Sequence, residues 1–218
     1  MRKKMSENNI STGKRCLIIA GAPECYFPIS FKKADFVIAC DAGYVHAMHA
    51  KIKPDLLVSD FDSFSGPIDA SVEILSAPSQ KDESDTMIAL KEAIRRGYSD
   101  IMIAGATGGR IDHMYANLQL LSFAAKNGVI CYIVDAHHQI FAISDSSVRV
   151  SHGQWKWLSV FAPAGDAKGV TLKGLKYELD DAVLNAANPM GVSNEFVSEE
   201  AVISVKQGIL LIMLSDLQ

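Results

Sequence analysis

The sequence lacks the features of exported and membrane-spanning proteins. No apolar run reaches the roughly 20 residues that a helix needs to cross a bilayer. Met1–Arg15 carries charge, and the apolar run that follows it, Cys16–Ala20, is too short to be the core of a signal peptide. We therefore expect a chain that is neither exported nor bound to a membrane and that works in the cytoplasm.

Cysteine is scarce, and its spacing excludes the common cysteine motifs. None of the four cysteines forms a C-x-x-C pair, which excludes a zinc knuckle and a thioredoxin-like site. Three of them lie inside apolar runs. We therefore expect small, buried, reduced side chains.

Several catalytic and nucleotide-binding fingerprints are also missing. Thr12-Gly-Lys14 lacks the first glycine of a Walker A loop, and neither G-x-G-x-x-G nor G-x-S-x-G occurs. The charge balance is mildly acidic, with 21 basic and 25 acidic residues and a net charge of -4. Because nucleic-acid binding requires clustered basic residues, we expect no nucleic-acid partner.

The first part of the chain alternates short apolar runs with helical patterns. Apolar residues recur at the spacing of a helix from Met87 onward, and again from Ile111 onward. Several of the strand-like runs are almost continuously apolar, as in parallel strands covered on both faces. This alternation predicts an open α/β sheet. The predicted strands are 16–20, 36–40, 56–59, 72–76, 101–104 and 129–134.

After about residue 143 the pattern becomes strand after strand, punctuated by glycines. This predicts an antiparallel β-sandwich or barrel. The expected fold is thus an α/β domain at 15–143 and a β-sandwich domain at 147–218, with the boundary near Ser144–Ser146 and a polar tail at 1–14. The predicted strands are 147–151, 155–161, 170–172, 175–179, 201–205 and 209–214.

Acidic residues follow the predicted strands of the first domain. Asp60 and Asp62 come directly after the strand at 56–59, and residues two apart in extended backbone point to the same side. Open α/β sheets bind ligands at the carboxyl ends of their strands. Two converging carboxylates repel each other unless a cation such as Mg²⁺ lies between them. The alternative is a solvated acidic turn.

Three further acids occupy equivalent places. Asp41 ends the strand at 36–40, and Asp82 and Asp85 flank Ser84 just before a predicted helix. Ser84 is suited to be the N-cap of that helix, and Asp85 would interact favourably with its positive end. A capping role and a ligand-binding role are compatible for Asp85.

A glycine-rich segment, Gly105-Ala-Thr-Gly-Gly-Arg110, follows another strand and opens a helix. Glycines let backbone N–H groups approach an anion, and the helix start adds favourable charge. Arg110 is able to grip a phosphate with two hydrogen bonds. Asp112, His113 and Asn117 fall on the first turns of the helix, where either nucleotide contact or capping explains them. Asp135-Ala-His137-His138 only faintly resembles the phosphoesterases with an Asp-His-His motif.

These motifs occur in an order that resembles the thiamine pyrophosphokinase family. The first four segments are similar to the catalytic domain of that family, and the last two resemble its thiamine-binding domain. The similarity extends over about residues 16 to 214. The segments are Asp41-Ala-Gly43, Pro54–Ser63, Lys81–Asp85, Gly105–His113, Gly174–Tyr177 and Gly191–Glu195.

The resemblance implies an enzyme that uses Mg²⁺ to transfer the pyrophosphoryl group of ATP to the thiamine hydroxyl, giving thiamine diphosphate and AMP. It also implies a homodimer whose active sites lie between the α/β domain of one chain and the sandwich of the other. The implied roles are as follows: Asp41, Asp60, Asp62 and Asp85 as metal ligands, Asp62 and Asp85 also as catalytic residues, Lys81, Asp82, Ser84, Gly108, Gly109, Arg110, Asp112 and His113 at ATP, and Ser193 and Asn194 at thiamine.

Two positions depart from the family pattern. Ser59 stands where the family usually has glycine before its Asp-Phe-Asp-Ser, and Ala42 replaces one of two glycines after the first aspartate. Both residues are small, so close approach of the backbone should survive. A two-metal phosphohydrolase and a non-catalytic thiamine or nucleotide sensor are the alternative functions.

Overall fold

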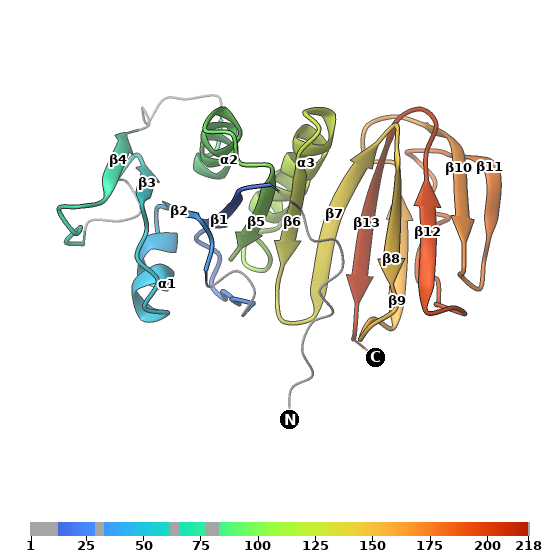
Figure 1. The fold of residues 1–218 in the computed structure, drawn as a ribbon, viewed down its shortest axis with the longest axis horizontal. Coiled ribbons are helices and arrows are strands. Elements are labelled where there is room, and N and C mark those ends of the chain that lie inside the picture. The colour runs from blue at the N-terminus through green and yellow to red at the C-terminus, as the bar shows by residue number, and fades with distance from the viewer. Residues whose placement is uncertain (1–12, 29–32, 62–65, 77–82, 218) are drawn as a thin grey trace. The chain divides into compact units, whose positions relative to one another are not determined.

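The structure is a computed structural model that describes residues 13–28, 33–61, 66–76 and 83–217 (Figure 1). Its contacts divide the chain into two compact units. The α/β unit contains Gly13–Leu120 and Val129–Ala136, and the β unit contains residues 121–128 and 137–217. The predicted fold class, an α/β sheet followed by antiparallel strands, is confirmed.

Six parallel strands form the sheet of the α/β unit in the order β4-β3-β2-β1-β5-β6. The chain first adds strands on one side of β1 and then returns to its other side. The point where this direction reverses, at β1, is where open α/β sheets form their ligand crevice. The strands are β1 (Arg15–Ile19), β2 (Phe36–Cys40), β3 (Leu56–Ser59), β4 (Glu73–Ser76), β5 (Asp100–Ala104) and β6 (Ile130–Val134).

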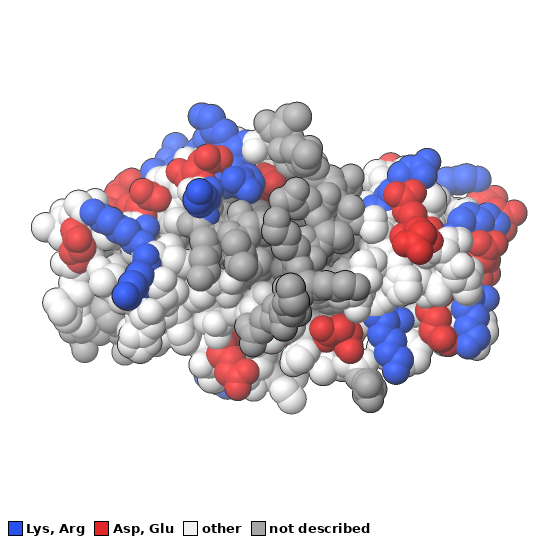
Figure 2. All heavy atoms as spheres, turned by 60° about the horizontal axis from the view of Figure 1, so that its bottom comes forward, with Lys and Arg blue, Asp and Glu red and all other residues white. Residues whose placement is uncertain are grey.

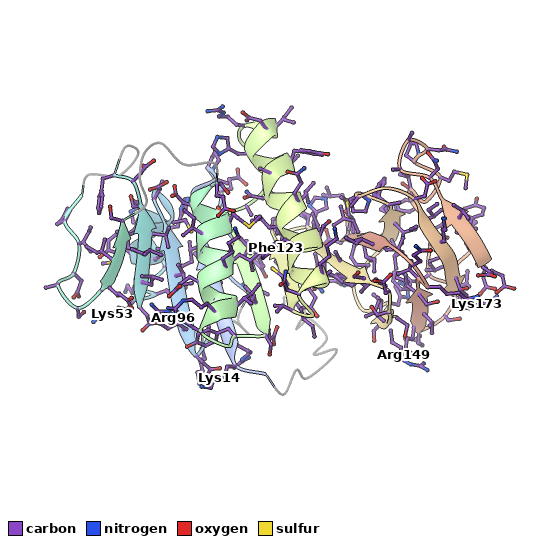
Figure 3. All side chains as sticks on the ribbon, turned by 90° about the horizontal axis from the view of Figure 1, so that it is seen from above. Lys14, Lys53, Arg96, Phe123, Arg149 and Lys173 are labelled. Carbon is purple, nitrogen blue, oxygen red and sulfur yellow. The ribbon has the colours of Figure 1, made fainter. Side chains whose placement is uncertain are left out.

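Three helices accompany this sheet: α1 (Gly43–His49), α2 (Asp85–Arg95) and α3 (Ile111–Lys126). Right-handed crossovers put α1 on one face and α2 and the start of α3 on the other. Figure 3 looks onto the face that carries α2 and α3. Side chains of the central strands are fully buried between these layers, which explains their continuous apolar runs.

Both ends of α2 are held by specific contacts. Ser84 is the N-cap, and its Oγ accepts a hydrogen bond from the Met87 amide at 3.3 Å, as predicted. At the other end Arg96, labelled in Figure 3, lies over the Phe36 ring with its Cζ 4.9 Å from the ring centroid. Arg96 also forms ion pairs with Glu92 at 2.6 Å and with Glu73 at 2.7 Å. These contacts tie α2 to the amino ends of β2 and β4.

The β unit contains only antiparallel pairings among its named strands. β7 (His138–Ser144), β13 (Ile209–Ser215) and β9 (Trp157–Phe161) lie side by side, and the other four form a sheet in the order β11-β10-β12-β8. Buried and partly buried positions alternate along β9 and β12, so each strand turns one face inward. The four are β8 (Ser147–Ser151), β10 (Ala167–Lys173), β11 (Leu179–Leu184) and β12 (Glu200–Ser204).

Two strands of the β unit differ from the predictions. The predicted strand at 175–179 is wrong: Glu178 Oε1 accepts a hydrogen bond from the Gly174 amide at 2.8 Å and closes a turn there, and β11 begins only at Leu179. β7 was not predicted, and it pairs along its whole length with β13. The compact units change after residues 120, 128 and 136, and the domain boundary at 144–146 stays a prediction.

No helix in the described part of the chain is long and apolar enough to cross a membrane. On the face shown in Figure 2, the coloured Lys and Arg side chains are interspersed with Asp and Glu. This mixed surface differs from the continuous basic field that binds nucleic acid.

Candidate active site

A cleft of about 890 Å³ opens at the carboxyl ends of the strands in the α/β unit. The loops after β1, β2 and β5 form its walls, together with the first turns of α2 and α3. This is the crevice that the reversal of strand order at β1 creates. The cleft lies entirely within the α/β unit.

Three of the predicted metal ligands come together in the α/β unit. Asp41 follows β2, Asp60 follows β3 and Asp85 begins α2, and each offers a carboxylate oxygen within 4.8 Å of the other two. All three residues are half-buried. Three carboxylates this close repel one another strongly unless a cation neutralises them.

Asp41 gives the strongest sign of a cation. Its Oδ1 is buried and has no hydrogen-bond partner among the described residues. A buried carboxylate oxygen without a partner is costly, and hard cations such as Mg²⁺ take such oxygens as ligands. The donor set therefore fits a divalent metal.

The loops that present these acids have unusual but well-supported backbones. Asp41 adopts a left-handed conformation with φ 45°, and its amide donates to the Val58 carbonyl oxygen at 3.1 Å. Ser59 is completely buried, and its Oγ accepts a hydrogen bond from the Phe61 amide at 2.9 Å. The serine that departs from the family glycine thus stabilises the turn beside Asp60.

The glycine-rich loop after β5 needs its glycines for two reasons. Gly105, Gly108 and Gly109 all have positive φ, which only glycine adopts without strain. A Cβ at Gly105 would lie 2.6 Å from the Ala20 carbonyl oxygen, and one at Gly109 would lie 2.9 Å from Cδ of Pro23. The loop is therefore packed directly against the segment that follows β1.

Arg110 and Asp112 form an exposed ion pair at the start of α3, with Nη2 of Arg110 2.7 Å from Oδ2 of Asp112. This hydrogen bond lowers the pKa of Asp112 and raises that of Arg110. The His113 amide donates to the same carboxylate at 3.0 Å. Arg110, Asp112 and His113 all line the cleft, as do Ser84, Gly108 and Gly109.

Three predicted site residues, Asp62, Lys81 and Asp82, lie outside the described residues. Ser193 and Asn194 lie in the β unit. The amide of Ser193, which is exposed, donates to Ser159 Oγ at 3.0 Å. Asn194 is buried, and its backbone N–H and C=O both pair with Leu158.

The side chain of Asn194 is occupied by neighbouring backbone groups. Its Oδ1 accepts hydrogen bonds from the amides of Tyr177 and Glu195, each at 3.0 Å. Its Nδ2 donates to the Tyr177 carbonyl oxygen at 2.7 Å. Asn194 therefore joins two segments of the β unit, and a direct contact with thiamine stays a prediction.

Other polar residues that stood out in the sequence have structural partners. Asp135 accepts a hydrogen bond from Thr107 at 2.8 Å, and Asn117 donates to the Ala106 carbonyl oxygen at 3.0 Å. Nδ1 of His137 lies 2.9 Å from Asp216 Oδ1. Each of these pairs joins neighbouring segments within one unit.

Sequence reasoning missed one wall of the cleft, the segment Ala20–Pro23. The only local signal was Gly-Ala-Pro directly after a strand, which is common in turns. It also missed Cys40, which is buried and lines the cleft. An apolar run that ends in cysteine gives no sign of such a role.

Comparison with known proteins agrees with this arrangement. Residues 27–133 match the family model described as the catalytic domain of thiamin pyrophosphokinase, and residues 145–210 match its vitamin B1 binding domain. Together the two matches cover most of the chain. The protein belongs to the thiamin pyrophosphokinase family.

Relatives along the whole length support this membership. The chain is 29% identical over 209 residues to the thiamine pyrophosphokinase of Bacillus subtilis, covering 91% of this chain and 97% of that protein. The Bacillus subtilis enzyme has a solved structure with a TM-score of 0.85 at 26% identity, covering 93% of this chain and 99% of that one. A family protein of Enterococcus faecalis gives 0.82 at 31% identity, covering 94% and 100%.

Proposed function

We propose that this protein transfers the pyrophosphoryl group of ATP to the hydroxyl group of thiamine and releases AMP. The observation that carries the proposal is the convergence of Asp41, Asp60 and Asp85 in the α/β unit, with one buried carboxylate oxygen unpartnered among the described residues. Such acids suit Mg²⁺, which usually reaches proteins together with substrate phosphates. Family membership supports both substrates.

Asp41, Asp60 and Asp85 would hold the magnesium ion, and we propose Asp62 as a further ligand. When bound, the ion neutralises charge on the polyphosphate. The residues of the chain then act mainly by positioning, because phosphoryl transfer depends on alignment and charge neutralisation.

The glycine-rich loop and the start of α3 are proposed to hold the phosphates. Gly108 and Gly109 leave the backbone open to an anion, and Arg110 at the cleft supplies positive charge. Lys81 is proposed to add a second positive charge. Ser84 holds the start of α2 in place, and Asp82, Asp112 and His113 complete the proposed ATP site.

In the proposed reaction the thiamine hydroxyl oxygen forms a bond to the β-phosphorus of ATP. The bond between that phosphorus and the oxygen bridging it to the α-phosphorus breaks, and AMP leaves with that oxygen. Asp85 is the residue proposed to meet the hydroxyl and accept its proton. Its place at the amino end of α2 also favours a negative charge.

Thiamine is proposed to bind at the loop of Ser193 and Asn194, in a homodimer whose active sites combine two chains. Asn194 holds the backbone of an exposed tyrosine, and exposed apolar residues flank Asn194 in the sequence; such groups often mark binding surfaces. They are Tyr177, Met190, Val192 and Val197, which are 50% to 65% exposed. The four described cysteines are all free, which suits the proposed cytoplasmic location.

The direct test is incubation with ATP, Mg²⁺ and thiamine, followed by detection of AMP and thiamine diphosphate. We expect both products in equal amounts and neither without thiamine. Hydrolysis of ATP without thiamine would favour a phosphohydrolase. Binding of thiamine or ATP without turnover would favour a sensor.

A second test addresses the shared site. An Asp85→Asn chain lacks a proposed metal ligand, and a Ser193→Arg chain sets a positive charge against cationic thiamine. If the sites are shared, mixing the two inactive chains restores partial activity, because one site of each mixed dimer has both intact halves. No recovery after demonstrated subunit exchange would favour a site within one chain.

A further inference from the structure

His46 contacts the wall of the cleft without being part of it. His46 lies on α1, and its Nε2 is 2.7 Å from the backbone carbonyl oxygen of Ala22. Because a carbonyl oxygen only accepts hydrogen bonds, Nε2 must carry the proton that is shared. Of the described residues that line the cleft, four come from Ala20–Pro23, and His46 is not one of them.

The segment Ala20–Pro23 is held from two sides. The amides of Ala20 and Ala22 donate to the carbonyl oxygens of Ala104 and Gly105 at 2.8 and 2.9 Å, which fixes the segment to β5 and its loop. The carbonyl oxygen of Ala22 turns to His46 instead. Proline has no N–H, so this carbonyl is the only hydrogen-bonding group of the Ala22–Pro23 peptide.

Pro23 packs against the glycine-rich loop, so the position of one depends on the position of the other. The space beside Gly109 is so small that a Cβ there would lie 2.9 Å from Cδ of Pro23. A shift of Pro23 therefore shifts the loop that precedes Arg110. Interactions that position a substrate tolerate little displacement, and about 1 Å can cost a large factor in rate or affinity.

The helix that carries His46 is itself firmly placed. Gly43 begins α1 so close to β1 that a Cβ there would lie 2.0 Å from the Ile19 carbonyl oxygen. Tyr44 and Ala47 are buried beneath the helix. The imidazole of His46 thus extends from a rigid support toward a segment that has no secondary structure of its own.

We propose that His46 is a positioning residue for the nucleotide: by holding the Ala22 carbonyl oxygen it keeps Pro23 against Gly109 and so sets the shape of the phosphate-binding wall. The inference rests on the proposed function, since it assigns ATP to this cleft. His46 acts through Ala22 and Pro23 and makes no contact with substrate.

The test compares two substitutions at His46 with one at His49, which is exposed on the same helix. His46→Leu removes the donor, and His46→Gln keeps an N–H at a similar distance. We expect His46→Leu to raise the KM for ATP about three- to tenfold, which corresponds to the net free energy of one hydrogen bond. The KM for thiamine should stay within about twofold, His46→Gln should restore most of the ATP affinity, and His49→Leu should behave as the unmodified chain.

A purely structural role would lower the melting temperature of His46→Leu and leave the KM for ATP unchanged in the folded fraction, and this result would overturn the inference. Equal rises in both KM values would overturn it as well. If His46→Leu does not fold, His46→Asn replaces it, because its amide is too short to reach Ala22, and an unchanged KM for ATP again contradicts the proposal.

The experiment distinguishes an error in the proposed function from an error in the role of His46. If the unmodified chain makes no thiamine diphosphate, that function is wrong, but calorimetric titration of ATP into the same variants still tests His46. Weaker ATP binding in His46→Leu, restored in His46→Gln, would then support the positioning role by itself. Absence of any ATP binding by the unmodified chain would overturn both.

Discussion

The thiol of Cys40 donates a hydrogen bond to the backbone carbonyl oxygen of Asp85 at 3.7 Å, although 45 positions separate the two residues in the sequence. Cys40 is the last residue of β2, and Asp85 is the first residue of α2. The contact is weak in energy, as sulfur donors are, but it joins the carboxyl end of the strand to the start of the helix. Asp41, the next residue after Cys40, is thereby held beside the carboxylate of Asp85.

Asp41→Asn should abolish most of the activity without unfolding the protein. The substitution is nearly isosteric and removes one charge from three crowded carboxylates. Loss of a key electrostatic group typically costs about 10² to 10³ in rate. Without Mg²⁺ the variant should melt at the same temperature as the unmodified chain or higher, because repulsion between the acids is reduced.

The response to Mg²⁺ tests the same site without measuring activity. Binding to the folded state raises the melting temperature, so Mg²⁺ should stabilise the unmodified chain and stabilise Asp41→Asn much less. Asp180→Asn is the matched control, since it makes the same charge change on the exposed side of β11. A full Mg²⁺ response in Asp41→Asn would remove Asp41 from the metal site.

Arg110→Ala should weaken the apparent affinity for ATP more than that for thiamine. The side chain is 75% exposed and its ion pair with Asp112 lies on the surface, so its removal costs little stability. Loss of a charged hydrogen bond to phosphate should raise the KM for ATP about tenfold. Steady-state kinetics in each substrate check this.

Asp112→Asn provides the comparison, because it breaks the same ion pair and keeps Arg110. Asp112 is proposed to serve the ATP site through its ion pair with Arg110, and because an exposed ion pair contributes little, we expect the KM for ATP to change by less than about threefold. A rise confined to the KM for thiamine in Arg110→Ala would assign Arg110 to the other substrate.

Much of the α/β unit could be predicted from its sequence. The strands at 16–20, 36–40, 56–59 and 101–104 are buried on both faces, so their apolar runs are continuous. The acids after separate strands were predicted to be joint metal ligands through the family resemblance, and Asp41 and Asp60 do meet, because parallel strands end at one edge of the sheet. Ser84 marked the start of α2 correctly through ordinary capping chemistry.

The β unit was harder to predict, because its signals are not local. β11 is an edge strand, and its Asp180 and Asp181 face solvent, so it has little apolar pattern. β7 begins at His138, directly after His137, and is identified only by its partner β13, which lies far along the chain. The contact of His46 with Ala22 depends on where helix α1 meets the segment after β1, which no sequence spacing encodes.

Stability should fall in acid partly through Glu92. Hydrogen bonds from Arg95, and then from Arg96, lower the pKa of Glu92 to about 2, against the opposing effect of its burial. A carboxylate with a lowered folded-state pKa stabilises the protein fully above its unfolded pKa, near 4.5, and loses this contribution as the pH falls toward 2. The loss should therefore occur between these two pH values.

Glu92→Gln removes this titration and serves as the measurement. We expect the variant to be less stable than the unmodified chain by about 1 to 2 kcal/mol at neutral pH, since the arginine partners are partly screened by solvent. In urea unfolding the difference should shrink toward about pH 3. If the difference in the free energy of unfolding is the same across this pH range, the charge of Glu92 does not contribute to stability through its ion pairs.

Asn194 gives the sharpest separation between a structural and a binding role. Its amide makes three hydrogen bonds to the backbone of Tyr177 and Glu195 and is nearly inaccessible. Asn194→Ala leaves these buried groups without partners, which typically costs about 1 to 3 kcal/mol of stability. We therefore expect a clearly lower melting temperature for this variant.

Ser193→Ala is the neighbouring control, because Ser193 is exposed and bonds to Ser159 only through its backbone amide. It should not change the melting temperature. If its hydroxyl contacts thiamine, as proposed, the KM for thiamine should rise about two- to tenfold and that for ATP should not. For Asn194→Ala, a rise in the KM for thiamine measured well below its melting temperature would add a binding role to the structural one. An unchanged melting temperature would instead show that water replaces the lost hydrogen bonds at no cost, which the burial of Asn194 argues against.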